Sequence, residues 1–126
     1  MKKFILIFLV FFTQTVLADE ATLQESKYKY VEQSMGKGKP YFLELGAKGC
    51  KSCKIMGERL YKIKQKNPQY NIHFINVKKE RKVARELKVM MIPTQIIYDK
   101  DGKEVYRNIG LISMEELNKL LEKNQF

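Results

Sequence analysis

The pair Cys50 and Cys53 limits the fold of this chain more than any other feature, because the sequence contains no other cysteine. Residues 41–45, just before the pair, are apolar at every position but one and suit a buried strand. From residue 54 onward, apolar side chains recur at helical spacing. Two thiols three positions apart at a helix start lie on one face of one turn and can close a small disulfide ring. The pair therefore predicts a redox-active dithiol where a strand gives way to a helix.

The helix start makes the two thiols unequal. It offers unpaired N–H groups and roughly half a positive charge, so the thiolate of Cys50 is stabilised over its thiol. Lys48, Lys51 and Lys54 add positive charge nearby and act in the same direction. Cys50 is therefore the expected nucleophile. Cys53, one turn deeper, would resolve a mixed disulfide by attacking Cys50.

Two structural roles for the pair are the weaker alternatives. A structural zinc ion normally takes four ligands, whereas the chain offers two cysteines and a single histidine, His73. A static disulfide across so short a loop would constrain little of the unfolded chain. We therefore expect no bound metal and no cofactor, and we interpret His73 as a structural residue.

One acidic residue, Glu44, interrupts the apolar run of residues 41–45, six positions before Cys50. A buried carboxyl must be protonated or partnered. A raised pKa would let this carboxyl pass protons to and from Cys53. A solvent-facing glutamate, or one paired with a lysine, is the alternative.

The amino terminus has the pattern of a secretory signal peptide. Lys2 and Lys3 precede an unbroken apolar run over residues 4–12, and Ala18 closes a segment that suits signal peptidase. The run is short for a membrane span. We therefore predict that residues 1–18 are removed and that the mature protein is periplasmic. An uncleaved membrane anchor is the alternative.

Charge and export together limit the classes of partner. The chain carries a net charge of +10, of which about +8 remains without Lys2 and Lys3. Basic proteins attract nucleic acids, acidic partners or anionic membranes, but export argues against nucleic acid. The basic residues are spread along the chain among glutamates, as on a solvated surface. Weak contact with anionic membranes is the most that we expect from the charge.

The rest of the chain suits a single domain. We assign residues 19–40 to an amino-terminal helix (19–35) and a connector with glycine and proline, and residues 41–126 to the domain. A strand, helix, strand succession after residue 41 implies a right-handed parallel crossover. The elements expected from there are strand 41–45, helix 50–67, strand 71–77, helix 80–88, strands 95–98 and 104–109 around a turn at 99–102, and a capped helix beginning at Ser113.

These features together resemble the thioredoxin family over residues 39–123. The resemblance rests on Cys50-Lys51-Ser52-Cys53 at a strand-to-helix junction, Ile92-Pro93-Thr94 about forty residues later, the turn at 99–102 and Gly110. It implies an α/β thioredoxin fold, with a central mixed sheet of about four strands and helices on both faces.

The resemblance also implies roles around the dithiol. A cis peptide bond before Pro93 would place the backbone of Ile92 beside the sulfurs, where it can pair with a substrate strand. The family's buried acid falls on Glu44, where thioredoxins use Asp. The substrate-binding surface would be completed by Gly49, Lys51 and Ser52.

Four further features depart from the family pattern. Gly49 replaces the usual aromatic residue, and Lys51-Ser52 replaces Gly-Pro between the cysteines. Phe74 or a neighbour replaces the basic residue that often faces the buried acid. No clear first strand precedes Gly36.

The leading hypothesis is a periplasmic thiol–disulfide oxidoreductase that reduces disulfides in proteins, acts as a monomer and receives electrons from a membrane-embedded redox partner. Lys51 favours the oxidising direction, whereas Glu44 and Ile92 resemble the reducing branch of the family. The alternatives are a disulfide-donating oxidase or isomerase, a periplasmic copper-binding protein that uses the thiolates with Met90 and Met91, and a non-catalytic thioredoxin-like binding module.

Overall fold

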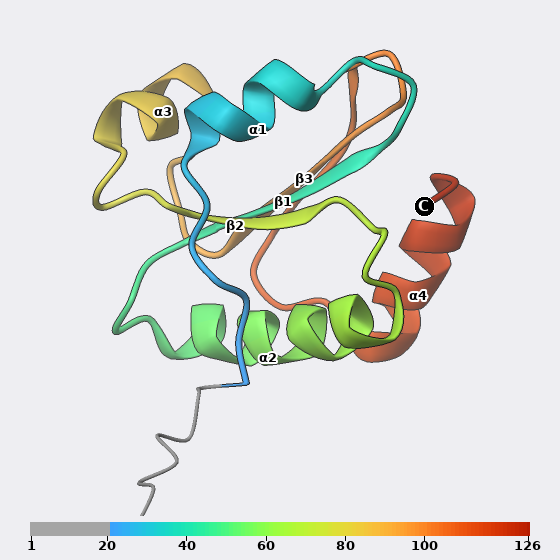
Figure 1. The fold of residues 1–126 in the computed structure, drawn as a ribbon. Coiled ribbons are helices and arrows are strands. Elements are labelled where there is room, and N and C mark those ends of the chain that lie inside the picture. Colours follow the sequence, from blue (N-terminus) through green and yellow to red (C-terminus); the bar gives the residue numbers. More distant parts are fainter. Residues whose placement is uncertain (1–20) are drawn as a thin grey trace, which may run out of the picture.

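The computed structural model describes residues 21–126, and a mixed four-stranded sheet forms its centre (Figure 1). β1 is parallel to β2 and antiparallel to β3, and β3 is antiparallel to β4. Every residue of β1 is buried, as its central place requires. The strands are β1 (Tyr41–Gly46), β2 (Ile72–Asn76), β3 (Thr94–Tyr98) and β4 (Glu104–Ile109), in the spatial order β2-β1-β3-β4.

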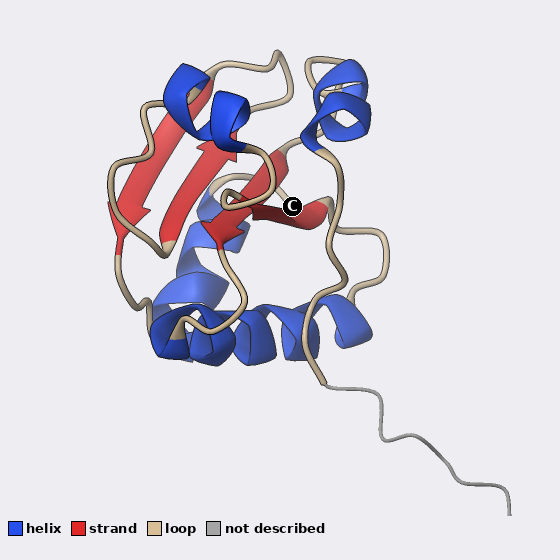
Figure 2. Ribbon diagram, turned by 90° about the vertical axis from the view of Figure 1, so that its left-hand side faces the viewer, coloured by secondary structure: helices blue, strands red, loops and turns tan. Residues whose placement is uncertain are grey.

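Helices cover both faces of the sheet, as Figures 1 and 2 show. α2 (Lys51–Lys66) and α4 (Met114–Lys123) lie on one face, and the shorter α1 (Tyr28–Ser34) and α3 (Arg81–Glu86) lie on the other. The predicted α/β class, a mixed sheet between helices, is confirmed. None of the helices within residues 21–126 is long and apolar enough to span a bilayer. The predicted signal peptide, residues 1–18, lies outside the described residues.

The alternation of side chains along β1 divides the interior into two cores. Phe42 packs with Met56 and Leu60 on the face covered by α2 and α4. Leu43 and Leu45 pack on the opposite face, under α1 and α3. Full burial of side chains of this size stabilises the fold by about 1.5–3 kcal/mol each. Glu44 shares the face of Phe42, so its carboxyl points into the core beneath α2.

The predicted amino-terminal helix over 19–35 is wrong in its first half. Among the described residues, the helix occupies only Tyr28–Ser34, and the preceding segment is non-helical. Glu25 forms a parallel bridge to Phe74, and the N–H of Ser26 donates to the Phe74 carbonyl at 2.8 Å. Pairing with the free edge of β2 satisfies backbone groups that a helix would otherwise bond internally. This short bridge stands where the sequence showed no clear first strand.

Candidate active site

Cys50 and Cys53 form a disulfide at the start of α2, with their Cα atoms 5.2 Å apart. Cys50 is the N-cap residue, and its Sγ accepts a hydrogen bond from the Cys53 N–H at 3.2 Å. Cys53 is buried, with 6% of its surface exposed, whereas Cys50 is half-buried. The first sulfur is thus the more accessible of the two, and a backbone donor already points at it.

The end of β1 packs directly beneath Cys53. A Cβ atom at Gly46 would lie 3.0 Å from Cys53 Sγ and 3.3 Å from the Phe74 ring, so a side chain here would force the site apart. Glu44 precedes Gly46 by two residues and therefore lies on the same face, about 6.8 Å away along the strand. The register pairs Glu44 with Phe74, which confirms that an aromatic residue stands at this level of β2.

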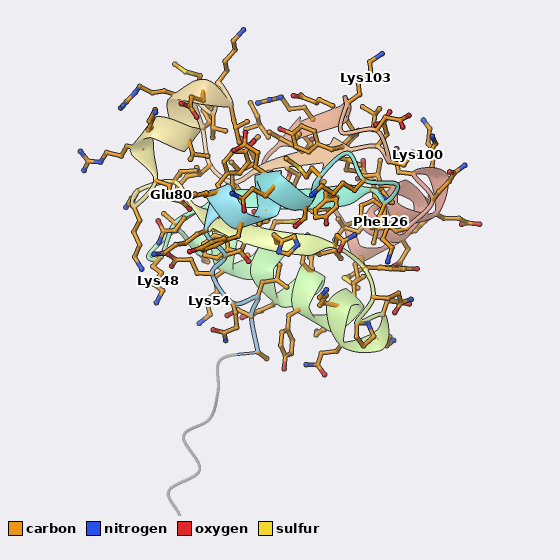
Figure 3. All side chains as sticks on the ribbon, turned by 45° about the horizontal axis from the view of Figure 1, so that its top comes forward. Lys48, Lys54, Glu80, Lys100, Lys103 and Phe126 are labelled. Carbon is orange, nitrogen blue, oxygen red and sulfur yellow. A yellow bond between two sulfur atoms is a disulfide. The ribbon has the colours of Figure 1, made fainter. Side chains whose placement is uncertain are left out.

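The surface around the dithiol is positively charged. The first turn of α2 contains no acidic residue, and Lys48, Lys51 and Lys54 are exposed. Within residues 21–126, none of these three lysines forms a salt bridge. Figure 3 shows Lys48 and Lys54 extending from the same side of the molecule. Their positive charge favours a thiolate at Cys50 over the neutral thiol.

The loop before β3 brings Ile92 and Pro93 to the dithiol end of the sheet. Their peptide bond is cis, Pro93 is buried and Ile92 is half-buried. The Pro93 carbonyl accepts a hydrogen bond from the Gly110 N–H at 2.8 Å, which ties the loop to the end of β4. Met90 and Met91 lie just before it with exposures of 88% and 62%. The loop therefore presents an apolar rim beside the disulfide end of β1.

Glu44 is 1% exposed, and only one of its oxygens has a partner within the described residues. Its Oε2 accepts a hydrogen bond from Gln95 Nε2 at 3.1 Å, whereas Oε1 has none. Burial raises the pKa of Glu44 to about 8, although the Gln95 hydrogen bond opposes the rise. The alternatives of a solvent-facing or lysine-paired glutamate are therefore wrong. A buried carboxyl with a raised pKa, on the strand that ends beneath Cys53, is suited to move protons.

The chain matches the family model for a thioredoxin-like domain over residues 28–125, which is most of its length. The chain belongs to the thioredoxin-like family. It is 32% identical to the thioredoxin of Chlamydia trachomatis over 83 residues, which cover 66% of this chain and 80% of that protein. It is 27% identical to the thioredoxin of Mycoplasmoides gallisepticum over 92 residues, which cover 73% and 91%.

Solved thioredoxin structures agree with this assignment. The thioredoxin NaTrxh of Nicotiana alata superposes with a TM-score of 0.70 and 27% identity, over 79% of this chain and 85% of that one. A mutant thioredoxin of Halobacterium salinarum gives a TM-score of 0.72 at 16% identity, over 86% and 96%, and supports the fold alone. With its dithiol pair, this thioredoxin-like chain is a thiol–disulfide oxidoreductase.

The structure brings the predicted site residues of this thioredoxin-like protein to one end of the sheet. Gly49 has a positive φ of 82°, which favours glycine in the turn into the dithiol. Lys51 is exposed and Ser52 half-buried on the first turn of α2.

Sequence reasoning missed two polar residues of the site, Gln95 and Asn108. Gln95 is fully buried and contacts Glu44 from β3, and Asn108 reaches Gln95 from β4. The one signal for Gln95 was a polar residue in the otherwise apolar strand 95–98. Asn108 has no comparable signal, because its contact depends on the register between β3 and β4.

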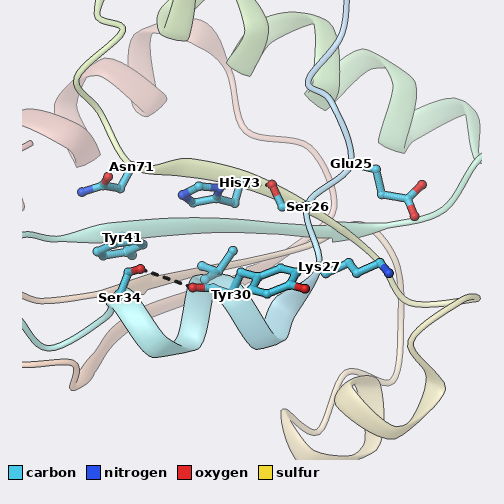
Figure 4. A pocket seen from close by; sticks show the side chains of 9 residues that line it. Glu25, Ser26, Lys27, Tyr30, Ser34, Tyr41, Asn71 and His73 are labelled. Carbon is cyan, nitrogen blue, oxygen red and sulfur yellow. Dashed lines mark hydrogen bonds between the residues drawn. The ribbon is translucent and has the colours of Figure 1, made fainter.

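His73 lies away from the dithiol, in a groove between α1 and the edge of β2 (Figure 4). Its ring stacks on Tyr41 at 5.8 Å, and its Nδ1 lies 3.2 Å from Ser26 Oγ. Burial first, and Lys64 second, lower the pKa of His73, which favours the neutral form of the ring. These contacts agree with the interpretation of His73 as a structural residue.

Proposed function

We propose that this protein reduces disulfides in protein substrates outside the cytoplasm, with Cys50 as the nucleophile and Cys53 as the resolving thiol. The observation that carries the proposal is the unequal burial of the pair, because the accessible sulfur caps α2 while its partner lies beneath it. A nucleophile must reach a substrate, and a resolving thiol needs only to reach the nucleophile.

The exchange proceeds in two balanced steps. The Cys50 thiolate attacks one sulfur of the substrate disulfide; that bond breaks, a mixed disulfide forms and the other substrate sulfur leaves as a thiolate. Cys53 gives its proton to Glu44 and attacks Cys50. The internal disulfide forms and the second substrate thiolate departs, so two electrons pass from the dithiol to the substrate. With a pKa of about 8, about a tenth of Glu44 is ionised at pH 7 and able to accept that proton.

Substrate docking is assigned to the loop beside the dithiol. The backbone of Ile92 would pair with an extended substrate strand, and the cis bond would keep the ring of Pro93 against the sulfurs. Gly49, with open space at its Cα, leaves room for the substrate chain. Lys51 and Ser52 complete this surface on α2.

The reducing direction is supported by the relatives, which are named thioredoxins. The active-site disulfide of thioredoxin has a reduction potential of about −270 mV, low enough to donate electrons to most substrates. Lys51 and the Cys53 N–H favour the oxidising direction, because a stabilised Cys50 thiolate makes the disulfide more oxidising. In an oxidising compartment the reduced form must be regenerated, so the proposal includes a membrane-embedded electron donor.

Export through the signal peptide of residues 1–18 is the basis for placing the protein in the periplasm. The family match begins at residue 28, so this segment lies outside the matched residues. Amino-terminal sequencing of protein from the periplasmic fraction should begin at Asp19. Recovery of an intact Met1 in the membrane fraction would instead support an uncleaved anchor.

The dithiol mechanism is tested with Cys53→Ser. The variant keeps the nucleophile but has no resolving thiol, so it should accumulate a mixed disulfide with insulin and fail to turn over. The trapped sulfur should be Cys50 by mass spectrometry. Insulin reduction at the wild-type rate by Cys53→Ser would overturn the proposed roles.

One observation favours a second candidate, a Cu(I)-binding function. Met90 and Met91 are both exposed, as thioether ligands beside the thiolates must be, since methionines in the core could not reach an ion. Titration of the reduced protein with Cu(I) against a chelating competitor tests it. Weaker Cu(I) binding in the double variant Met90→Leu/Met91→Leu would support a site shared by the thiolates and the methionines. Unchanged Cu(I) binding in that variant would show that the methionines are not ligands.

A further inference from the structure

The side-chain amide of Gln95 uses all of its hydrogen-bonding groups within the core. Nε2 donates to Glu44 Oε2 at 3.1 Å and to the Gly110 carbonyl at 3.0 Å. Oε1 accepts from Asn108 Nδ2 at 2.8 Å. Gln95 is 0% exposed, so water offers no replacement for any of these bonds.

These contacts permit only one orientation of the amide. Rotation by 180° would turn Oε1 toward the Gly110 carbonyl, so that two acceptors faced each other, and would set Nε2 against the donor of Asn108. Each of those clashes would leave buried polar groups unpaired. Asn108 and Gly110 therefore fix the amide so that its N–H points at Glu44.

The fixed amide makes the two oxygens of Glu44 unequal. Oε2 is held as an acceptor, so in the neutral acid the proton resides on Oε1, which has no partner within residues 21–126. Gln95 from β3 contacts this carboxyl, and Phe74 is the register partner of Glu44 on β2. The sulfur of Cys53 packs against Gly46, two residues further along the same face of β1. Burial and the Gln95 bond account for the shifted pKa of Glu44, with no contribution from a charged side chain.

We propose that Gln95 is a positioning residue for proton transfer at the dithiol, holding Glu44 by Oε2 and leaving Oε1 to exchange a proton with Cys53. The inference rests on the proposed function, since it explains how Glu44 is prepared for its role. In the step, the S–H bond of Cys53 breaks, an O–H bond forms at Oε1, and the Cys53 thiolate attacks Cys50. The proton returns when the internal disulfide is next reduced.

The same contacts connect the acid to the loop that carries Pro93. The Gly110 N–H donates to the Pro93 carbonyl, and the Gly110 carbonyl accepts from Gln95. Gln95 thus orients Glu44 from the strand that begins directly after the loop. The hydrogen bonds of Gln95 thus connect β1, β3 and β4 at the dithiol end of the sheet.

Gln95→Leu tests the inference, because leucine keeps the volume but removes the donor. We expect the midpoint of the Glu44 titration, followed by carbon NMR of its carboxyl in the oxidised protein, to rise by about one pH unit. The ionised fraction at pH 7 should fall about tenfold, and resolution of a mixed disulfide should slow by the same factor at pH 7 but not above pH 9. Gln65→Leu, on the exposed carboxyl-terminal part of α2, is the matched control and should change neither quantity.

Asn108→Ala provides a second variant on a half-buried strand position, in case Gln95→Leu does not fold. It removes the bond that holds Gln95 Oε1 and should raise the Glu44 midpoint by less than Gln95→Leu does. If Gln95→Leu folds and its Glu44 midpoint is unchanged, the inference is overturned. If only Asn108→Ala folds, an unchanged midpoint in that variant overturns it. If the midpoint stayed unchanged while the wild-type protein exchanged disulfides, only the positioning role would fail. A wild-type protein that reduced no disulfide at any pH would overturn the proposed function as well.

Discussion

The starts of α2 and α4 have the same cap geometry and opposite charges. At α2, Cys50 Sγ accepts from the N–H three residues on at 3.2 Å; at α4, Ser113 Oγ does the same, also at 3.2 Å. The first turn of α4 contains Glu115 and Glu116 and its last turn Lys123, as the helix dipole favours. The first turn of α2 has no acidic residue.

This difference separates a helix start built for stability from one built for chemistry. Lys51 and Lys54 oppose the dipole of α2, and an unfavourable charge at an exposed helix end costs about 0.3–1 kcal/mol. The same charges favour an anion at the cap, where the Cys50 thiolate forms. Glu44 follows the same logic in the core, since a buried carboxyl costs stability and provides a proton acceptor. Changes at the dithiol end should therefore affect exchange, and changes at α4 should affect stability alone.

The largest expected effect is the loss of exchange in Cys50→Ser. Serine retains an oxygen to cap α2 but supplies no thiolate, so insulin reduction should fall by more than about a thousandfold. The free energy of unfolding should stay close to that of the reduced wild-type protein, measured in urea with dithiothreitol. Residual turnover near the wild-type rate would show that the cap sulfur is not the nucleophile.

Glu44 should make the folded protein less stable as the pH rises. Its pKa is raised from 4.5 to about 8, so the unfolded chain binds fewer protons between these values, and the stability present below pH 4.5 is lost as the pH approaches 8. The loss should be roughly 4 kcal/mol between pH 4 and pH 8. In Glu44→Gln this part of the pH dependence should disappear in urea unfolding curves. Parallel curves for the two proteins would mean that the carboxyl ionises normally in the fold.

The parts of the fold that sequence could predict are those set by local signals. Every helix and strand between residues 41 and 109 lies within two residues of its predicted bounds, and α4 begins directly after its predicted cap, because turn residues and apolar periodicity mark these positions. The apolar neighbours of Glu44 along one strand indicated that its carboxyl could be buried, but they left a solvent-facing glutamate as the alternative. The unequal roles of Cys50 and Cys53 could be predicted because the N–H groups at a helix start stabilise a nearby thiolate.

The parts that sequence could not predict depend on contacts between distant segments. The bridge of Glu25 to Phe74 belongs to the free edge of β2, which nothing near residue 25 reveals. The bonds of Gln95 to Glu44 and Asn108 depend on the registers of β3 against β1 and β4. A polar residue in a strand signals a partner but does not say which one.

Ser113→Ala should have an effect smaller than that of the Glu44 change and larger than that of Lys51→Gln, and it should change stability alone. Loss of the cap to the Glu116 N–H should lower the free energy of unfolding by about 1 kcal/mol, while the reduction potential stays unchanged. Ser113→Thr, which keeps a capping hydroxyl, is the matched control. If Ser113→Ala shifted the reduction potential and left the free energy of unfolding unchanged, the start of α4 would serve the dithiol and not stability, against this account.

Lys51→Gln should have the smallest effect. Removing one exposed charge beside Cys50 should raise the pKa of that thiol and stabilise α2 by a few tenths of a kcal/mol. Thiolate absorbance against pH measures the first quantity, and added salt should reduce the difference between the proteins. Lys100→Gln, in the distant turn between β3 and β4, should leave the thiol unaffected.

The equilibrium between the Cys50–Cys53 disulfide and its dithiol, measured in glutathione or dithiothreitol redox buffers, tests the central claim most directly. We predict a reduction potential near the −270 mV of thioredoxin, which would make the protein a reductant that depends on a membrane electron source. A potential near −120 mV would contradict the claim and identify a disulfide donor, in which the lysines and the cap at α2 outweigh the buried acid.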